Sequence, residues 1–240
     1  MTMTKTQYSR RWWTDKYQLI LLNGASLLEI GCVNCLRSMK NKSINRCRYL
    51  EFDSALDIGY GGGWASEALR DLCGRVTAID ARRDAKEIDG VNCIRGHNYI
   101  DYQFCHKFDL IFASHVLEHQ LEPNTFLNKI RKDLSDDGHA LITVPPHKEE
   151  LAGGHVTTWN AGMLVYHLVL AGFDCRQCEI LSEGYNVSVL VKNSHNGIDI
   201  NKLTFSSRDI GAVQKFFPGS IRFGRTGIVN RFRWNVNKKS

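Results

Sequence analysis

A glycine-rich string carries the residues best suited to hold a cofactor. It reads Asp57-Ile58-Gly59-Tyr60-Gly61-Gly62-Gly63-Trp64 and continues an apolar run. Glycines permit a tight turn, let the backbone approach a ligand without a Cβ, and expose N–H groups at the start of a helix. Asp80 ends the next apolar run, 23 residues after Asp57. A carboxylate at that place can accept hydrogen bonds from both hydroxyls of a ribose, so these residues predict a nucleotide-cofactor loop.

Three histidines are candidates for acid–base chemistry. An imidazole with a pKa of about 6.5 can take a proton from a hydroxyl near neutral pH. His119 closes the string His115-Val116-Leu117-Glu118-His119, His155 follows a pair of glycines, and His147 follows two prolines. We expect His119 and His155 to be the catalytic candidates, with a purely structural or positioning role as the alternative for each.

The same string matches the H-x-x-E-H pattern of metalloproteases, in which two histidines bind zinc. That reading needs a long helix and a further acidic ligand, such as Glu179 or Glu183. Here the string directly follows a predicted strand and is followed within a few residues by Pro123. We therefore expect no metal site.

The pattern of apolar runs predicts the elements that must position these residues. Between residues 55 and 180, short apolar runs alternate with helix-length segments, which is typical of βαβ units and a parallel sheet. Most of the runs are apolar on both faces, as in strands covered by helices on each side. The predicted strands are 55–58, 76–79, 91–94, 108–113, 140–144, 175–181 and 187–191, the predicted helices are 64–72, 123–134 and 160–171, and a turn is predicted at 136–138.

The order of these strings resembles that of class I S-adenosylmethionine-dependent methyltransferases. Asp57 to Gly63 reads Asp-x-Gly-x-Gly-x-Gly, similar to the first motif of that superfamily, and Trp64 stands where a dinucleotide fold would have its third glycine. The series Phe108 to His119, Pro123, and Leu134 to Pro145 is similar to the later motifs of its small-molecule and glycan members. The resemblance covers roughly residues 52–181. It implies a doubly wound, mostly parallel, Rossmann-like α/β sheet with helices on both faces.

The resemblance implies S-adenosyl-L-methionine as the cofactor and assigns residues to it. Four residues would shape the pocket for its methionine end, Asp80 would hold the ribose, and three residues would border the adenine and the sulfonium. Where the family often has an acid for the adenine amino group, this chain reads Arg95-Gly96-His97-Asn98, so His97 or Asn98 would take its place. Asp57 as a strand-end cap and Asp80 as a helix cap or exposed charge are the simpler alternatives. The four residues at the methionine end are Asp57, Gly59, Gly61 and Gly63, and the three that border the adenine and the sulfonium are Ala81, Ser114 and His115.

Composition and charge limit the classes of protein to which the chain could belong. The chain has 240 residues, of which 43% are hydrophobic and 23% charged, so collagen-like and fully disordered classes are excluded. Its longest apolar-leaning stretch, 19–33, is interrupted by polar residues and is too short for a membrane span. With no signal-peptide pattern, we expect a cytoplasmic protein whose eight cysteines are reduced, and buried thiols rather than structural zinc at Cys32-x-x-Cys35 and Cys175-x-x-Cys178.

The end of the chain is basic and aromatic. Residues 202–240 contain nine Lys or Arg and a single acid, Asp209, while the whole chain has a net charge of +6. This segment could bind nucleic acid, dock on an anionic membrane surface or a lipid-linked glycan, or simply pack its aromatic rings on the domain. We divide the chain into an N-terminal helical extension (1–50), a cofactor-binding domain (51–195) and this C-terminal extension (196–240).

The activity predicted from these observations is O-methylation of a small hydroxyl compound, with a sugar or a surface-polysaccharide precursor as the expected acceptor. A nucleic-acid methyltransferase is one alternative, and a cofactor-binding protein without catalysis is another. The string Leu27-Leu28-Glu29-Ile30-Gly31-Cys32, with Glu51 downstream, is a weaker candidate for the first motif because it lacks further glycines.

Overall fold

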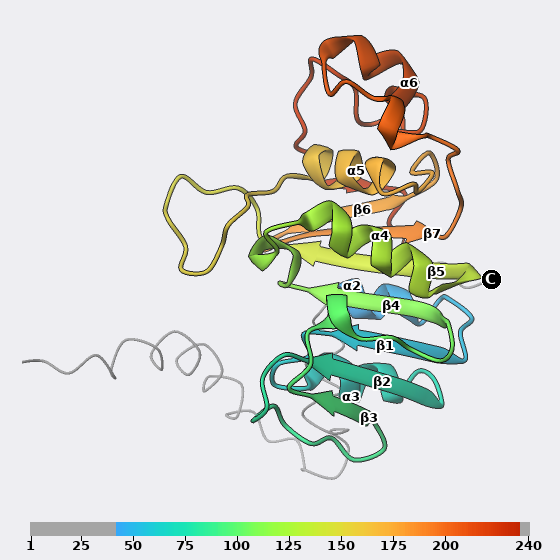
Figure 1. Ribbon diagram of the computed structural model, residues 1–240, viewed down its shortest axis with the longest axis vertical. Helices are drawn as coiled ribbons and strands as arrows, with labels where there is room; N and C mark the ends of the chain where they lie inside the picture. Colours follow the sequence, from blue (N-terminus) through green and yellow to red (C-terminus); the bar gives the residue numbers. More distant parts are fainter. Residues whose placement is uncertain (1–41, 236–240) are drawn as a thin grey trace, which may run out of the picture. The chain divides into compact units, whose positions relative to one another are not determined.

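The computed structural model describes residues 42–235, and these form an eight-stranded sheet (Figure 1). The strand order is β3-β2-β1-β4-β5-β7-β6-β8. The strands are β1 (Ser54–Ile58), β2 (Arg75–Asp80), β3 (Asn92–Arg95), β4 (Phe108–Ser114), β5 (Leu134–Val144), β6 (Glu179–Glu183), β7 (Asn186–Lys192) and β8 (Arg231–Phe232).

The first five strands are parallel and the last three are antiparallel to their neighbours. β1 pairs in parallel with β2 and with β4, and β2–β3 and β4–β5 are also parallel. β7 runs antiparallel to β5 and β6, and β8 pairs antiparallel with β6. The chain therefore winds outward from β1 to β3 and then returns to β4, which confirms the predicted doubly wound, mostly parallel sheet. In such sheets, ligands bind beyond the carboxyl ends of the strands where the winding reverses, here β1 and β4.

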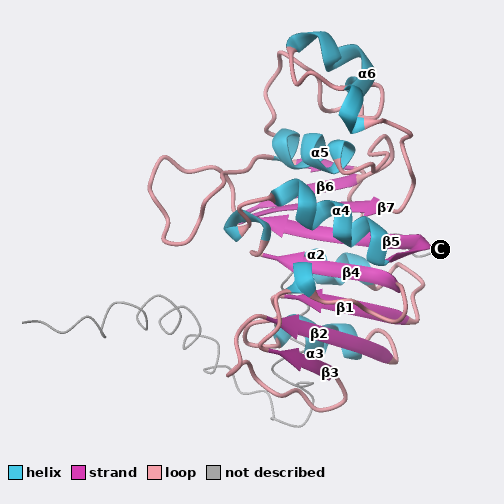
Figure 2. Ribbon diagram, viewed as in Figure 1, coloured by secondary structure: helices cyan, strands magenta, loops and turns pink. Residues whose placement is uncertain are grey.

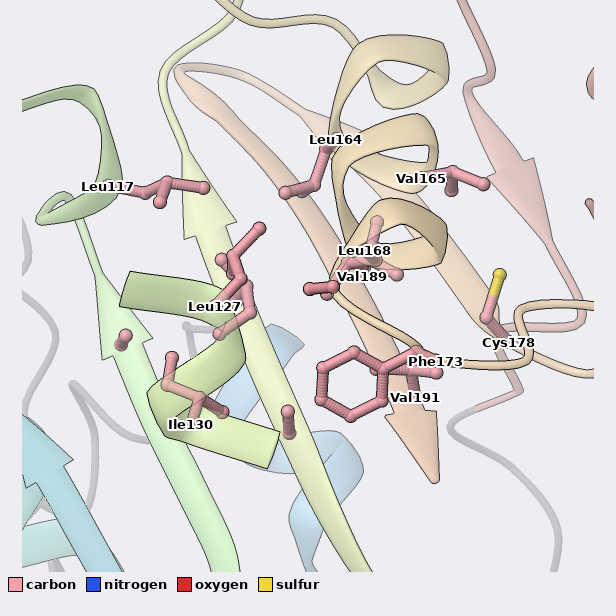
Figure 3. Close-up of a cluster of buried hydrophobic side chains, with 14 of the residues drawn as sticks. Leu117, Leu127, Ile130, Leu164, Val165, Leu168, Phe173, Cys178, Val189 and Val191 are labelled. Atoms are coloured by element: carbon pink, nitrogen blue, oxygen red, sulfur yellow. The ribbon is translucent and has the colours of Figure 1, made fainter. Parts of the chain in front are cut away.

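Helices cover both faces of the sheet (Figure 2). On one face, α2 (Lys42–Cys47) and α3 (Trp64–Arg70) contribute Ile44, Ala65 and Leu69 to one buried hydrophobic cluster. On the other face, α4 (Pro123–Asp133), α5 (Ala161–Leu170) and α6 (Ile210–Gln214) contribute to a second cluster. Figure 3 shows Leu127 of α4 and Leu164 of α5 reaching into this second cluster.

Local sequence explains where the two long helices begin and end. Pro123 occupies the first turn of α4, where its missing N–H costs nothing. The Asn160 side chain accepts a hydrogen bond from Met163 N and caps α5. Gly172, with φ of +94°, ends α5 in the left-handed conformation that favours glycine.

Two predicted strand starts were wrong by four residues or more. β5 begins at Leu134 rather than at residue 140, because Leu134 pairs with Phe108 before the register shifts and His139 pairs with Leu110. The predicted turn at 136–138 is thus a bulge within the strand, with Asp136 and Asp137 exposed. β6 begins at Glu179 rather than at residue 175.

The four residues before β6 hold one of the two cysteine pairs. Cys178 N donates to Cys175 O in a tight turn, and both thiols are buried and free. This agrees with the prediction of buried thiols at Cys175-x-x-Cys178. Burial raises the pKa of the Cys175 thiol well above its usual value, so the thiol stays protonated at neutral pH.

The C-terminal segment packs onto the sheet. Val213, Phe217 and Val229 are buried in the cluster with α4 and α5, and Trp234 is buried on the opposite face. Phe205 and Phe223 are exposed. Most of the apolar residues of the basic segment up to Trp234 therefore pack on the domain, which was one of the three roles considered for it.

Several expectations concern residues outside the described range. They are the N-terminal helical extension up to residue 41, the pair Cys32-x-x-Cys35 and the alternative first motif at 27–32. Among residues 42–235, no helix is long and apolar enough to cross a membrane.

Candidate functional site

The glycine-rich loop follows β1 and begins α3. Gly59, Gly61 and Gly63 all have positive φ, at +67°, +53° and +84°. A Cβ at Gly59 would lie 2.5 Å from Val116 Cγ2, and one at Gly63 would lie 2.5 Å from Ile88 Cδ1. By contrast, a Cβ at Gly62 would meet nothing within 4 Å. The loop is therefore packed closely against the protein at its two ends and open in its middle.

Asp80, at the end of β2, closes onto this loop. Its Oδ2 accepts a hydrogen bond from Gly61 N at 2.9 Å, and its Oδ1 accepts one from Arg82 N at 2.9 Å. Oδ1 accepts a second hydrogen bond from Arg82 Nε, so the acceptor position that remains for a ribose hydroxyl is the second one on Oδ2. The Arg82 guanidinium also donates to Asp80 Oδ1 and to Gly61 O. Arg82 was not among the predicted site residues.

Asp57 lies beneath the loop rather than on its open side. Its carboxylate is buried and accepts a hydrogen bond from Ser66 Oγ of α3. Burial raises the pKa of Asp57 to about 7, although the Ser66 hydrogen bond acts to lower it. In this position Asp57 joins β1 to α3 and so positions the loop from within.

The residues predicted to surround adenine are exposed. Ala81, His97 and Asn98 are all on the surface, and His97 makes an edge-to-face contact with Tyr102. The Asn98 side-chain oxygen accepts a hydrogen bond from Ile100 N and caps a short 3-10 turn. The adenine amino group donates, so Asn98 would bind it through the second lone pair of this oxygen.

Ser114 and His115 lie at the carboxyl end of β4, and both are half-buried. His115 has φ of +56°, a left-handed conformation that is uncommon for histidine. Its Nε2 lies 2.8 Å from Asn186 Oδ1, and its ring stacks on Tyr185. Burial acts to lower the pKa of His115, but Glu118 and Asn186 act more strongly to raise it, so the pKa is raised overall.

The tertiary structure brings the two predicted catalytic histidines together. The rings of His119 and His155 meet edge to face with centroids 5.0 Å apart. His119 Nε2 lies 3.8 Å from Glu118 Oε1, and His155 Nε2 lies 4.0 Å from the same oxygen. Glu118 is fully buried, and neither of its carboxylate oxygens has a hydrogen-bond partner among residues 42–235. One ligand atom from each of the three side chains lies within 4.8 Å of the others.

Backbone hydrogen bonds hold the loop between β5 and α5 against this string. Val156 N donates to Glu118 O at 2.8 Å, and Thr157 N donates to the same oxygen at 3.3 Å. Gly154 O lies 2.7 Å from His119 Nδ1. Figure 1 shows this loop projecting beyond the carboxyl ends of the parallel strands. His155 is therefore fixed beside Glu118 by the loop's own backbone.

His147, the third candidate base, lies on the exposed part of the same loop. Its backbone N donates to Trp159 O, and it is absent from the cluster formed by Glu118, His119 and His155. The metalloprotease arrangement is also absent from the described chain: the string directly follows β4 and ends in a single 3-10 turn, Leu117–His119, rather than lying in a long helix.

Glu118 was quoted in the sequence motif but was not among the predicted site residues. The signal that could have found it is its position: an acid within an apolar string just after a buried strand. The buried glutamate gains its significance from His155, which lies 37 residues further along the chain. No local pattern connects the two.

The loop and Asp80 fit S-adenosylmethionine. The open middle of the loop allows close approach to the backbone, and Asp80 Oδ2 retains one acceptor position for a ribose hydroxyl. Gly59, Gly61 and Gly63 would accommodate the methionine end, with Asp57 positioning them, and the cofactor supplies an activated methyl group on its sulfonium. Ser114 and His115, at the end of the neighbouring β4, remain predicted neighbours of the sulfonium.

Comparisons with known proteins agree with this fold. The family described as "Methyltransferase domain" matches residues 39–169. The chain is 24% identical over 142 residues to a ubiquinone biosynthesis O-methyltransferase of Hydrogenovibrio crunogenus, covering 55% of this chain and 54% of that protein. It is 28% identical over 155 residues to the protein of the same name from Glaesserella parasuis, covering 59% and 56%. The matches thus span little more than half the length of these relatives.

Solved structures share the fold at lower identity. The N-methyltransferase NodS of Bradyrhizobium japonicum, in complex with S-adenosyl-L-homocysteine, aligns with a TM-score of 0.53 at 15% identity, covering 72% of this chain and 94% of that one. A Burkholderia thailandensis 1,6-didemethyltoxoflavin-N1-methyltransferase, with its acceptor and S-adenosylhomocysteine bound, aligns with a TM-score of 0.54 at 18% identity, covering 65% and 77%.

Proposed function

Since this chain belongs to the methyltransferase-domain family and has the fold of class I S-adenosylmethionine-dependent methyltransferases, we propose that it transfers the methyl group of S-adenosylmethionine to a hydroxyl oxygen of a small molecule. The cofactor of this class is S-adenosylmethionine, and two structural neighbours hold its demethylated product. The observation that carries the proposal is the junction of the glycine loop with Asp80, where Gly61 N donates to Asp80 Oδ2 at 2.9 Å.

The names of the relatives support oxygen as the accepting atom. They are O-methyltransferases of ubiquinone biosynthesis, which favours a hydroxyl of a quinone precursor or of another hydroxylated ring. The sugar or polysaccharide-precursor acceptor expected from the sequence gains no support from these relatives. A glycan, membrane or nucleic-acid partner gains none either. A hydroxylated aromatic compound is therefore the first acceptor class to test.

For the methyl transfer itself, the main task of the protein is to position the acceptor oxygen. A sulfonium is already a strong methyl donor, so an oxygen held in line at about 3–3.5 Å from the methyl carbon gains much of the acceleration from proximity. The hydroxyl must also lose its proton. His119 and His155, next to the end of β4, are the groups we propose to assist that step, either as bases or through a ligand they hold.

The test of the cofactor site is calorimetric titration of the full chain with S-adenosylmethionine and S-adenosylhomocysteine. Asp80→Ala should weaken both affinities roughly 10- to 100-fold, since hydrogen bonds to a charged group contribute about 1.5–3 kcal/mol. Asp71→Ala is the matched control, because Asp71 is an exposed aspartate at the end of α3. Unchanged affinity in Asp80→Ala would overturn the ribose assignment.

Methyl transfer is then measured with labelled S-adenosylmethionine against hydroxylated aromatic compounds and, separately, sugars. Turnover on the aromatic compounds alone supports the proposed acceptor class. Turnover on sugars alone would restore the acceptor expected from the sequence. Tight cofactor binding with no transfer to any acceptor would favour a cofactor-binding protein without catalysis.

A further inference from the structure

The carboxylate of Glu118 is buried and accepts no hydrogen bond from the described residues. Its side chain is 0% exposed, and both oxygens lack a hydrogen-bond partner within the described part of the chain. His115 Nδ1 lies 3.3 Å from Glu118 Oε1 and forms an ion pair with it when His115 is protonated, but this contact lacks the geometry of a hydrogen bond and involves only one of the two oxygens. A buried ionised carboxylate is costly unless it is paired or binds a metal. This group therefore points to a positively charged ligand.

His119 presents its free nitrogen to this carboxylate. A carbonyl oxygen can only accept, so the 2.7 Å contact with Gly154 O requires a proton on His119 Nδ1. In the neutral imidazole, the lone pair is then on Nε2, the atom that lies 3.8 Å from Glu118 Oε1. A histidine whose second nitrogen donates to a backbone carbonyl is the usual arrangement of a metal ligand.

The spacing of the three side chains is close to that of a metal site. Ligands at about 2.0–2.2 Å from a tetrahedral ion lie roughly 3.4 Å from one another. The distances from Glu118 Oε1 to His119 Nε2 and His155 Nε2 are 3.8 and 4.0 Å. The three ligand atoms lie within 4.8 Å of one another, so side-chain shifts of up to about 1 Å would bring them to these distances. His119 and His155 are 43% and 21% exposed, so an ion between them can be reached from solvent.

We propose that Glu118, His119 and His155 bind a divalent transition-metal ion, with Zn²⁺ as the best match, at the carboxyl end of β4. Two imidazoles and one carboxylate suit zinc or cobalt, whereas Mg²⁺ takes oxygen ligands. Three protein ligands leave a fourth position open, which is the pattern of catalytic rather than structural zinc.

The use of that open position rests on the proposed function. An acceptor hydroxyl bound there would lose its proton to water more readily. Its oxygen electron pair would form the bond to the methyl carbon, and the electrons of the carbon–sulfur bond would remain on sulfur. The two histidines would then serve as ligands instead of as bases.

The test is titration of the full, tag-free chain, stripped with a chelator, with Co²⁺ and Zn²⁺ and no methyl donor. The intact protein should bind one equivalent, with the visible absorption of a low-symmetry Co²⁺ site and without the intense charge-transfer band of cobalt–thiolate bonds. Mg²⁺ should bind much more weakly. His155→Ala and Glu118→Gln should each weaken binding by more than about tenfold.

His195→Ala is the matched control, because His195 is exposed and lies outside the cluster. It should bind like the intact protein. If Glu118→Gln does not fold, the partly exposed His155 still provides the test. No binding, a thiolate spectrum, or equal affinity in all variants would overturn the site and leave Glu118 paired with His115 alone.

These outcomes are separate from those of the proposed function. Metal binding is measured without cofactor or acceptor, whereas the Asp80 titration needs no metal. If the protein binds metal but transfers no methyl group, the metal site stands and the proposed function is overturned. If it transfers a methyl group but binds no metal, the proposed function stands and the metal site is overturned.

Discussion

Two carboxyl groups of the central sheet have pKa values that shift in opposite directions. Burial raises the pKa of Asp57 to about 7, against a single hydrogen bond from Ser66 that lowers it. Burial also acts to raise the pKa of Asp109, but hydrogen bonds from Ser54, Ser135 and the backbone outweigh it, so that pKa is lowered. The number of donors therefore decides which form of each carboxyl group the fold prefers.

Asp57 predicts a loss of stability as pH rises. The unfolded carboxyl group has a pKa of about 3.9, so between pH 4 and 7 the unfolded chain releases its proton while the folded chain keeps it. The free energy of unfolding then falls through this range and levels off above about pH 7. Asp57→Asn removes this ionisation and should be more stable than the parent at pH 8 by a few kcal/mol, since one pKa unit corresponds to about 1.4 kcal/mol.

Urea denaturation at pH 5 and pH 8 measures this difference. Asp109→Asn is the opposite case, because it removes a carboxylate that the fold favours in its ionised form, and it should lower stability at neutral pH. If the unfolding free energies of Asp57→Asn and the parent change in parallel with pH, Asp57 does not titrate as described.

At the scale of elements, the loop after β1 is shaped by contact with the string after β4. Gly59 lies in left-handed conformation directly against Val116, while Gly62, three residues on, has open space around it. The loop that would hold the cofactor and the string that carries the histidines are thus packed on each other. This contact connects the predicted cofactor loop with the predicted catalytic histidines.

Gly59→Ala should therefore destabilise the protein by about 2–4 kcal/mol, combining left-handed strain with overpacking against Val116. Gly62→Ala should change stability by less than about 0.5 kcal/mol, as is usual at an unpacked surface position. Thermal and denaturant unfolding of the two variants make the comparison. Equal effects would show that the contact with Val116 does not constrain the loop.

At the scale of the whole described chain, the basic C-terminal segment is part of the core. Trp234 is 2% exposed and belongs to the cluster on the face of α3, and β8 extends the sheet beside β6. Val213 and Phe217 fill the opposite face beside α5. Removing residues 202–240 would therefore expose both faces, and the truncated chain is expected to lose stability whatever the segment binds.

Trp234→Ala should cost about 3–5 kcal/mol, as is typical for a buried aromatic residue. Ile228→Ala, at a side chain that is 70% exposed in the same segment, should cost less than about 0.5 kcal/mol. Chemical denaturation followed by circular dichroism measures both. A small effect at Trp234 would mean that the segment does not contribute to the core.

The sequence predicted the glycine-rich loop and the elements beside it well, because their signals are local. A strand, a glycine loop, a helix and Asp80 lie within the 27 residues of 54–80, and backbone geometry alone brings them together. The strands were found because buried parallel strands are apolar on both faces. The boundary errors at β5 and β6 arose where a bulge and a cysteine turn interrupt that pattern.

The sequence by itself thus determined the class of the fold, the family and the position of the glycine-rich loop, since short-range order along the chain specifies each of them. Only the tertiary structure decided that His155 meets Glu118 and His119, and that the basic segment is packed as far as Trp234. Both depend on contacts between residues far apart in the chain, and such contacts are set by how the sheet, its loops and its covering helices pack together.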